Sequence, residues 1–105
     1  MFMDITGDIQ KKIKAGLFEY SKHAVDQSIL RNITVGEVRE AFNSTPELLE
    51  DYQDDFYGPS CLLLVFTANR RPIHVICSYP TRPLIKLITV YEPDPDEWVD
   101  FRKRI

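Results

Sequence analysis

Residues 61–91, CLLLVFTANRRPIHVICSYPTRPLIKLITVY, decide the fold class of this chain. They contain three apolar runs, which the short polar segments NRRP and PTRP separate. Apolar and β-branched runs between such turn segments are typical of β-strands joined by hairpins. We therefore predict antiparallel strands at residues 61–68, 73–79 and 84–91. The first and last runs are apolar at both parities, which indicates central strands covered on both faces.

The acidic segment before these runs extends the predicted sheet. Residues 47–55, ELLEDYQDD, follow Pro46 and predict a fourth strand, whose charge suits the edge of a sheet. A turn at residues 57–60, YGPS, then leads into the next strand. Four strands joined by short turns predict an antiparallel meander.

Helical periodicity marks the beginning of the chain. One set of apolar residues recurs every four positions: Ile5, Ile9, Ile13 and Leu17. This spacing puts their side chains on one face of a helix, which we predict from Asp4 to Ala15 with Gly16 as its stop. Residues 18–20, FEY, are expected to be extended.

Two more helices are predicted before Pro46. Ser21 can cap the first of them, and Asn32 suits its end because asparagine tolerates left-handed backbone. Its predicted inward face has four residues: Ala24, Val25, Ser28 and Ile29. Thr34 and Glu37 have the spacing of a capping box and predict the start of a third helix.

The segment after the last strand, EPDPDEW at residues 92–98, is acidic and rich in proline. Its prolines end the strand, and Asp94 or Asp96 can cap a terminal helix that carries Trp98. Residues 102–104, RKR, would lie near the end of that helix, where positive charge is favourable. The same acidic turn could in principle hold a divalent ion, but its spacing matches no recognised loop, and turn and cap chemistry account for it.

These elements predict an α+β fold for one domain, 1–105: N-terminal helices, a four-stranded antiparallel sheet and a C-terminal helix. A length of 105 residues suits a single core. No apolar run approaches the roughly 20 residues of a membrane-spanning helix, and the N-terminus has no leader pattern. We therefore expect a cytoplasmic protein without a membrane partner.

Charge and cysteine content limit the function classes. The formal net charge of −3 argues against nucleic-acid binding through bulk charge, although clusters such as Arg70 with Arg71 leave a local basic face open. Cys61 and Cys77 lie inside apolar runs without the spacing of a zinc site, so buried free thiols are expected. No metal and no cofactor is predicted.

Four segments carry a family resemblance: SKHAVDQSILRNITVGEVREAF at 21–42, DDFYGPSCLLLVF at 54–66, RRPIHVICS at 70–78 and LIKLITVYEPDPDEWVDFRKR at 84–104. Together they resemble a bacterial family of unknown function, of the DUF4258 type, related to the RelE/ParE-like toxins of toxin-antitoxin systems. The matching positions are His23, Ala24, Arg31, Ile33, Thr34, Ile88 to Tyr91, Pro93, Asp94 and Trp98. Family members carry a further Arg where this chain has Gln27 and Ser28.

The resemblance implies a RelE/ParE-like fold and a toxin-like component of a toxin-antitoxin pair, with an antitoxin protein as partner. Relatives of this fold include ribonucleases, so a metal-independent endoribonuclease acting on RNA is one implied function. Such cleavage needs a base, an acid and cations that stabilise the phosphorane charge. The candidate catalytic residues are His74, Tyr91 and His23, and the candidate RNA-binding residues are Arg31, Arg70 and Arg71.

Each candidate residue also has a structural explanation. A strand histidine such as His74 is commonly a half-buried, hydrogen-bonded surface residue, and Tyr91 can pack its ring with the hydroxyl in water. His23 can sit beside a helix cap, and Arg31 can stabilise the C-terminus of its helix. A non-enzymatic interaction module, which binds a protein partner or forms a homodimer through its edge strand, therefore stands beside the ribonuclease hypothesis.

Overall fold

The computed structural model describes residues 4–56 and 58–105, so that Tyr57 of the predicted turn at 57–60 lies outside the described residues. Three helices are found: α1 (Ile5–Lys14), α2 (Lys22–Leu30) and α3 (Val35–Ala41). Seven strands accompany them: β1 (Phe18–Tyr20), β2 (Glu47–Tyr52), β3 (Ser60–Phe66), β4 (Pro72–Ser78), β5 (Ile85–Tyr91), β6 (Trp98–Val99) and β7 (Lys103–Arg104). No helix among these residues is long and apolar enough to cross a membrane.

The three helices begin where the sequence predicts. The side chain of Asp4 accepts a hydrogen bond from the backbone of Gly7, and Ser21 caps α2 in the same way. At the start of α3, Thr34 and Glu37 form both hydrogen bonds of a capping box, which confirms the prediction. These contacts satisfy backbone amides that have no partner inside the helix.

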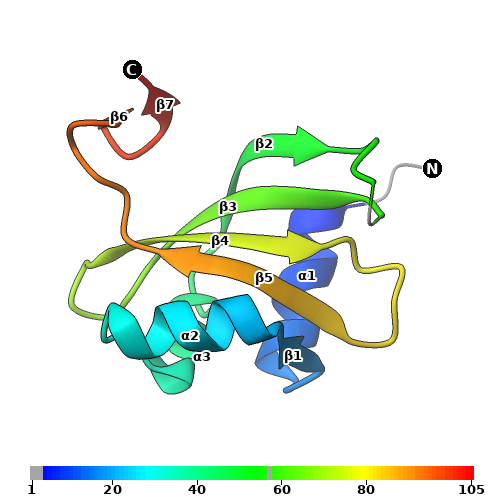
Figure 1. Ribbon diagram of the computed structural model, residues 1–105. Helices are drawn as coiled ribbons and strands as arrows, with labels where there is room; N and C mark the ends of the chain where they lie inside the picture. The colour runs from blue at the N-terminus through cyan, green and yellow to red at the C-terminus, as the bar shows by residue number, and fades with distance from the viewer. Residues whose placement is uncertain (1–3, 57) are drawn as a thin grey trace.

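The predicted four-stranded antiparallel sheet is wrong in one respect, because β1 joins it as a fifth strand. The order is β1-β5-β4-β3-β2 (Figure 1), with β1 parallel to β5 and the other pairs antiparallel. The extended backbone of Phe18–Tyr20 is predictable locally. Its partner, residues 85–87, lies far away in the sequence, and only the folded chain brings the two together.

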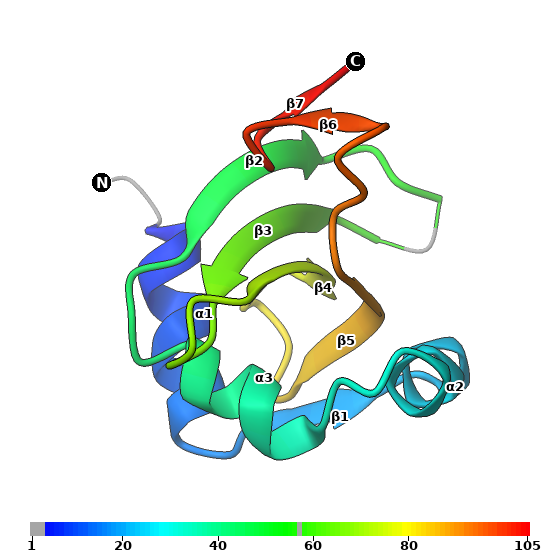
Figure 2. The ribbon, with the colours of Figure 1, turned by 90° about the vertical axis from the view of Figure 1, so that its left-hand side faces the viewer.

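The core lies on one side of this mixed sheet, where α1 and α3 pack (Figure 2). We call this side the inner face. Ile9 and Ile13 of α1 are buried against it, as their spacing predicts. From the strands, alternate residues such as Val75 and Cys77 of β4 enter the same core. The outer face carries the residues between them, and some of these are also buried, including Leu62, Leu64 and His74.

Helix α2 covers the edge of β5 beyond the end of β1 rather than a face of the sheet. The Ser21 hydroxyl donates to the carbonyl of Ile88 (3.0 Å), and the Gln27 side-chain carbonyl accepts from the amide of Val90 (3.0 Å). Two β5 backbone groups that no strand pairs are thus satisfied by side chains. Gln27, which stands near the position of the arginine of family members, has this structural role here.

The predicted inward face of α2 is only partly correct. Ala24 is buried, but Val25 is 41 % exposed and Ile29 is 75 % exposed. A helix at the edge of a sheet buries a narrower stripe than a helix lying on a face. Two apolar residues of α2 consequently remain at the surface.

The predicted C-terminal helix is also wrong, and with it the predicted RelE/ParE-like layout. Asp94 does start a turn, since its carbonyl accepts hydrogen bonds from Glu97 and Trp98 (both 2.9 Å), but the turn does not continue. Strands β6 and β7 follow as a short hairpin. A helix of so few residues is marginal by itself, and the hairpin instead buries Trp98.

Candidate functional site

His74 lies in the middle of β4, on the outer face of the sheet. Its register neighbours are Leu64 of β3 and Tyr91 of β5. Ile73 and Val75 enter the core on the inner face, as the alternation of a strand predicts. His74 is nevertheless 0 % exposed, because another part of the chain covers it.

Both ring nitrogens of His74 have a partner. Nε2 lies 2.7 Å from the carbonyl oxygen of Phe101, and Nδ1 lies 3.1 Å from the hydroxyl of Tyr91. A carbonyl oxygen can only accept, so Nε2 carries the proton and donates it. Nδ1 then accepts a hydrogen bond from Tyr91. The structure therefore brings two of the candidate catalytic residues together around a neutral imidazole.

The surroundings of His74 favour its uncharged form. Burial lowers the pKa of the imidazole below its ordinary value of 6.5, while the Phe101 carbonyl and the Glu50 carboxylate act in the opposite direction. Two aromatic rings also meet the imidazole edge-on: Trp98 at a centroid distance of 4.5 Å and Tyr91 at 5.1 Å. This environment is that of a neutral packing residue.

The lowered pKa of His74 predicts that acid destabilises the fold. Below about pH 6.5 the unfolded chain binds a proton at this residue that the folded chain resists, so the free energy of unfolding should fall as the pH drops from 7.5 to 5.5. The carboxyl groups with a lowered pKa, such as Glu47, have an ordinary value of 4.5 or less and act at lower pH. Urea unfolding at several pH values measures the effect.

Two variants separate this effect from other titrations. His74→Gln should lose less stability than the wild type over that pH interval, since it removes the group concerned. The other histidine, His23, is exposed and makes no hydrogen bond or ion pair with the described residues, so His23→Gln should follow the wild type. Equal pH slopes in the wild type and His74→Gln would contradict the prediction.

The element that covers His74 is the hairpin of residues 98–104, which we call the C-terminal hairpin. Arginines tie it to the edge strand β2: Arg102 donates to both oxygens of Glu47 (2.9 and 2.8 Å), and Arg104 to both oxygens of Glu50 (2.8 and 3.1 Å). These bonds lower the pKa of both carboxyl groups. Arg104 also lies over the ring of Trp98, 4.7 Å from its centroid.

The turn of the C-terminal hairpin aims a backbone carbonyl at His74. Asp100 and Phe101 have positive φ angles of 52° and 61°, as the two central residues of a type I′ turn do. Left-handed backbone is rare for an aromatic residue and costs free energy. Two contacts of Phe101 offset that cost. Its carbonyl oxygen accepts a hydrogen bond from His74, and its ring packs edge-on against the ring of Phe66, with the ring centroids 6.3 Å apart.

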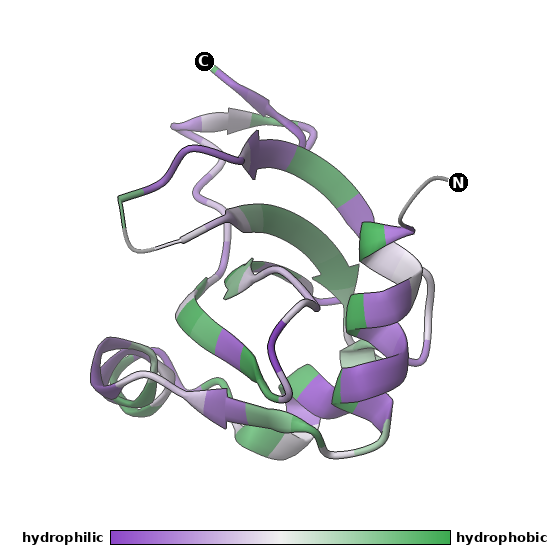
Figure 3. Cartoon of the chain, turned by 90° about the vertical axis from the view of Figure 1, so that its right-hand side faces the viewer, coloured by the Kyte–Doolittle hydropathy of each residue, from purple (hydrophilic) through white to green (hydrophobic). Residues whose placement is uncertain are grey.

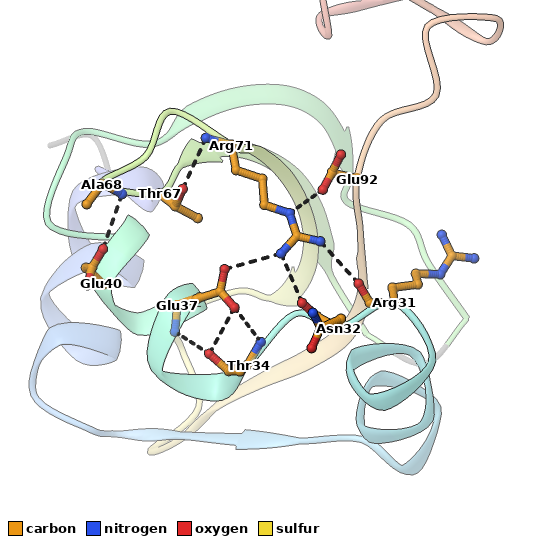
Figure 4. A network of polar contacts seen from close by, with 9 residues as sticks. All are labelled: Arg31, Asn32, Thr34, Glu37, Glu40, Thr67, Ala68, Arg71 and Glu92. Carbon is orange, nitrogen blue, oxygen red and sulfur yellow. Dashed lines mark hydrogen bonds and ion pairs between the residues drawn. The ribbon is translucent and has the colours of Figure 1, made fainter.

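Arg71 connects four segments of the chain (Figure 4). Its guanidinium donates to the backbone carbonyls of Arg31 (3.1 Å) and Asn32 (3.0 Å) at the end of α2, and it forms ion pairs with Glu37 of α3 and with Glu92 after β5. Bonds to both carboxylates raise the pKa of Arg71. The positive charge predicted to bind RNA is thus paired inside the fold.

The remaining candidate residues are Arg70, Arg31 and His23, and none of them is hydrogen-bonded to His74 or Tyr91 among the described contacts. Burial raises the pKa of Tyr91, and the charge of Arg31 acts in the opposite direction. Arg70 occupies a left-handed turn position (φ 66°), and its guanidinium lies over the ring of Phe66 at 5.3 Å. The side chain of Arg31 points away from Arg71 in Figure 4. His23 and Arg31 lie near opposite ends of α2, about 12 Å apart along the helix. Two of the six predicted residues, His23 and Arg31, are therefore separated by the length of α2.

Two cysteines and the acidic side chains offer no metal centre. Cys61 and Cys77 face each other across β3 and β4 as buried free thiols, which confirms the prediction. The hydrogen-bonding contact with Cys61, together with burial, raises the pKa of Cys77, so its thiol stays protonated. Within residues 4–56 and 58–105, no three His, Cys, Asp or Glu side chains form a group that could hold a metal ion.

A hollow of the described surface lies on the outer face, beside His74, and we call it the outer-face groove. It has a volume of about 540 Å³. Its lining comprises the floor residues Ile76, Ile88 and Thr89, the wall Asp51–Asp55, and Ser60. A second hollow of about 370 Å³ shares Asp55 and Ile88 with it and adds two cations, Arg82 and Lys86. The outer face therefore carries a trough with an apolar floor.

The sequence profile of one family, DUF4258, described as a domain of unknown function, matches residues 20–92. This chain belongs to the DUF4258 family. The resemblance inferred from the sequence is thereby confirmed at family level, while the bacterial origin and the relation to RelE/ParE-like toxins stay predictions. No curated protein and no solved structure matches the chain.

The DUF4258 match contains His74, Tyr91 and Arg71 but ends before the C-terminal hairpin. The segment that covers His74 in this chain is therefore outside the matched residues. Sequence reasoning selected His74 as a candidate acid or base, but it did not foresee that Trp98 and Phe101 cover this residue, and it missed the outer-face groove. The only early signal for the groove was the acidic run at 47–55, which by itself indicates no more than an exposed edge.

Proposed function

We propose that this DUF4258 chain is a non-enzymatic interaction module, which holds a segment of a partner protein in the outer-face groove. The observation that supports this function is the groove itself. Its floor residues Ile76 and Ile88 are apolar and only half-buried, although they lie on a rigid sheet. A preformed hollow with an apolar floor and polar walls is the usual form of a binding site for a small group or peptide.

The pairing of the candidate catalytic and RNA-binding residues also favours binding over catalysis. His74 is 0 % exposed and has both ring nitrogens engaged. Arg71 is paired with two carboxylates and two backbone carbonyls. A substrate phosphate would have to displace these partners, whereas a ligand in the groove displaces only water.

Homodimer formation through the edge strand is less favourable than binding of another protein in the groove. The two edge strands are the three-residue β1 and the longer β2. Strand β2 carries Glu47, Glu50 and Asp51 and has a register shift between Leu48 and Glu50. Two copies paired through β2 would bring their acidic residues together, and irregular, charged edges are the usual defence against such pairing.

A random peptide library displayed on phage tests the proposed function. We expect the wild-type protein to enrich peptides that bind it, and the variant Ile76→Arg to bind them at least tenfold more weakly, because a long charged side chain would fill the groove floor. Affinity is measured by fluorescence anisotropy with the enriched peptides. Circular dichroism establishes that each variant is folded.

The matched control is Ile29→Arg, which makes the same change at an exposed apolar residue of α2. It should leave peptide affinity unchanged. Thr89→Arg, at another floor position, replaces Ile76→Arg if that variant does not fold. Absence of any enriched peptide, or equal binding by groove and control variants, would refute the groove as the docking surface.

A toxin-like ribonuclease is the second candidate function. The 3.1 Å contact between His74 and Tyr91 favours it, since general acid-base catalysis needs groups within hydrogen-bond reach of each other. It requires displacement of the C-terminal hairpin, because the His74 ring is fully buried. An antitoxin would then be one form of the protein partner.

A further inference from the structure

We infer that the segment bound in the outer-face groove is basic and apolar, with Lys or Arg side chains beside the apolar ones. This inference rests on the proposed function and specifies the chemistry of the partner. It follows from the acidic side chains that line the groove and from two of them that have no partner among the described residues.

The charged side chains that line the outer-face groove are all acidic. Its lining includes Asp51, Asp54 and Asp55, and no Lys, Arg or His side chain is among its described lining residues. The end of β2 and the loop after it are hydrophilic in Figure 3, beside the apolar strand β3. A ligand on the apolar floor is therefore adjacent to a wall of carboxylates.

Only part of the acidic run at 47–55 is neutralised within the fold. Arg102 and Arg104 pair with Glu47 and Glu50, and Asp51 accepts hydrogen bonds from the Tyr79 hydroxyl and from the Gln53 amide. Among the described residues, no carboxylate after Asp51 in this run has a hydrogen-bond or ion-pair partner.

Asp54 and Asp55 have exposed carboxylates, and these make no hydrogen bond or ion pair with the described residues. Two carboxylates therefore line the groove without a counterion among residues 4–56 and 58–105. A cationic side chain of a partner would provide one, and like charges would be repelled.

The second hollow gives the bound segment a direction. Arg82 and Lys86 lie at that end, and Lys86 already pairs with Glu19 at 3.7 Å. The cations of the partner are thus expected beside Asp54 and Asp55, and its apolar residues over Ile76 and Ile88. Burial of the apolar residues would provide most of the affinity, while the exposed charges would determine which sequences bind.

The peptides selected from the random library test this inference. We expect Lys and Arg to be enriched, and Asp and Glu depleted, relative to the unselected library. For the tightest peptide, the double variant Asp54→Asn with Asp55→Asn should weaken binding about five- to tenfold. Raising the salt concentration should weaken binding to the wild type more than to this double variant, because exposed charge pairs are screened.

The matched control is Asp26→Asn with Asp96→Asn, which changes the net charge equally. Both residues are exposed, their carboxylates have no partner within the described chain, and neither lines the two hollows. This control should bind as the wild type does. Equal weakening in both double variants would mean a bulk charge effect and would overturn the inference.

Failure of the inference and failure of the proposed function give different results. If the enriched peptides are neutral or acidic and still bind Ile76→Arg more weakly than the wild type, the inference of a basic partner is wrong, but the groove remains the docking surface. No enriched peptide would overturn both. Self-association that Ile76→Arg abolishes, measured by analytical ultracentrifugation, would replace the basic segment with a second copy of this chain.

Discussion

Replacing His74 with alanine is expected to lower the free energy of unfolding by about 3 kcal/mol. The change removes a ring that is 0 % exposed and leaves a cavity between β4 and the C-terminal hairpin. It also removes the hydrogen-bond partners of the Phe101 carbonyl and the Tyr91 hydroxyl. Urea unfolding measures the loss, and the fluorescence of Trp98, the only tryptophan, reports on the hairpin itself.

The exposed histidine supplies the control for this prediction. His23→Ala should change the free energy of unfolding by less than about 0.5 kcal/mol, as surface substitutions usually do. A loss below about 1 kcal/mol in His74→Ala would contradict the structural role of this residue.

The same pair of variants addresses the ribonuclease hypothesis. If wild-type protein cleaves a labelled RNA in the presence of EDTA and folded His74→Ala does not, catalysis at His74 would be favoured over packing alone. Cleavage by both proteins would exclude His74 as the catalytic residue. Under the proposed binding function we expect neither protein to cleave RNA.

Replacing Arg71 with methionine is expected to cost about 2 kcal/mol of stability. Methionine keeps much of the apolar stem but leaves Glu37 and Glu92 without their cation and two carbonyls at the end of α2 without their donor. The guanidinium is partly exposed, so water can replace some of these contacts and the loss stays below that of His74→Ala. Thermal and urea unfolding measure it.

The neighbouring arginine is the matched control. The side chain of Arg70 has a single described contact, over the ring of Phe66, so Arg70→Met should cost less than about 1 kcal/mol. If the two arginine variants were equally stable, the network around Arg71 would not stabilise the fold as its geometry indicates. RNA binding lost in both variants alike would support the predicted RNA-binding roles instead.

Local interactions explain why much of the fold could be predicted from the sequence. The capping box of Thr34 and Glu37 involves residues three positions apart. Ile9 and Ile13 lie on the same face of their helix however that helix packs in the fold. The strands β3, β4 and β5 were likewise indicated by their composition and turns. In each case the residues that decide the element are those inside it or next to it.

The errors of prediction concern contacts between segments far apart in the sequence. Phe18–Tyr20 pairs with residues 85–87, which turns a four-stranded antiparallel sheet into a five-stranded mixed one. Trp98 packs against His74, which favours a hairpin over the predicted terminal helix. Neither contact leaves a local signal, because the partners meet only after the sheet has formed.

The candidate site divides in the same way. Strand alternation put His74 on the outer face, and the register then placed Tyr91 beside it. Alternation says nothing about a cover, so the burial of His74 under Phe101 could not be foreseen. Arg70 and Arg71 are equivalent in the sequence, yet only Arg71 reaches Glu37 and Glu92, because its position at the start of β4 faces them.

Short-range sterics and hydrogen bonds decide the helix caps, the apolar face of α1 and the three strands of residues 61–91, so the amino-acid sequence alone predicts these features. The tertiary structure alone decided that β1 joins the sheet and that the C-terminal hairpin covers His74. It also decided that the carboxylates of Asp54 and Asp55 line the outer-face groove without a partner in the described part of the chain. These features depend on which distant surfaces meet, and burial of apolar area over the whole chain determines that.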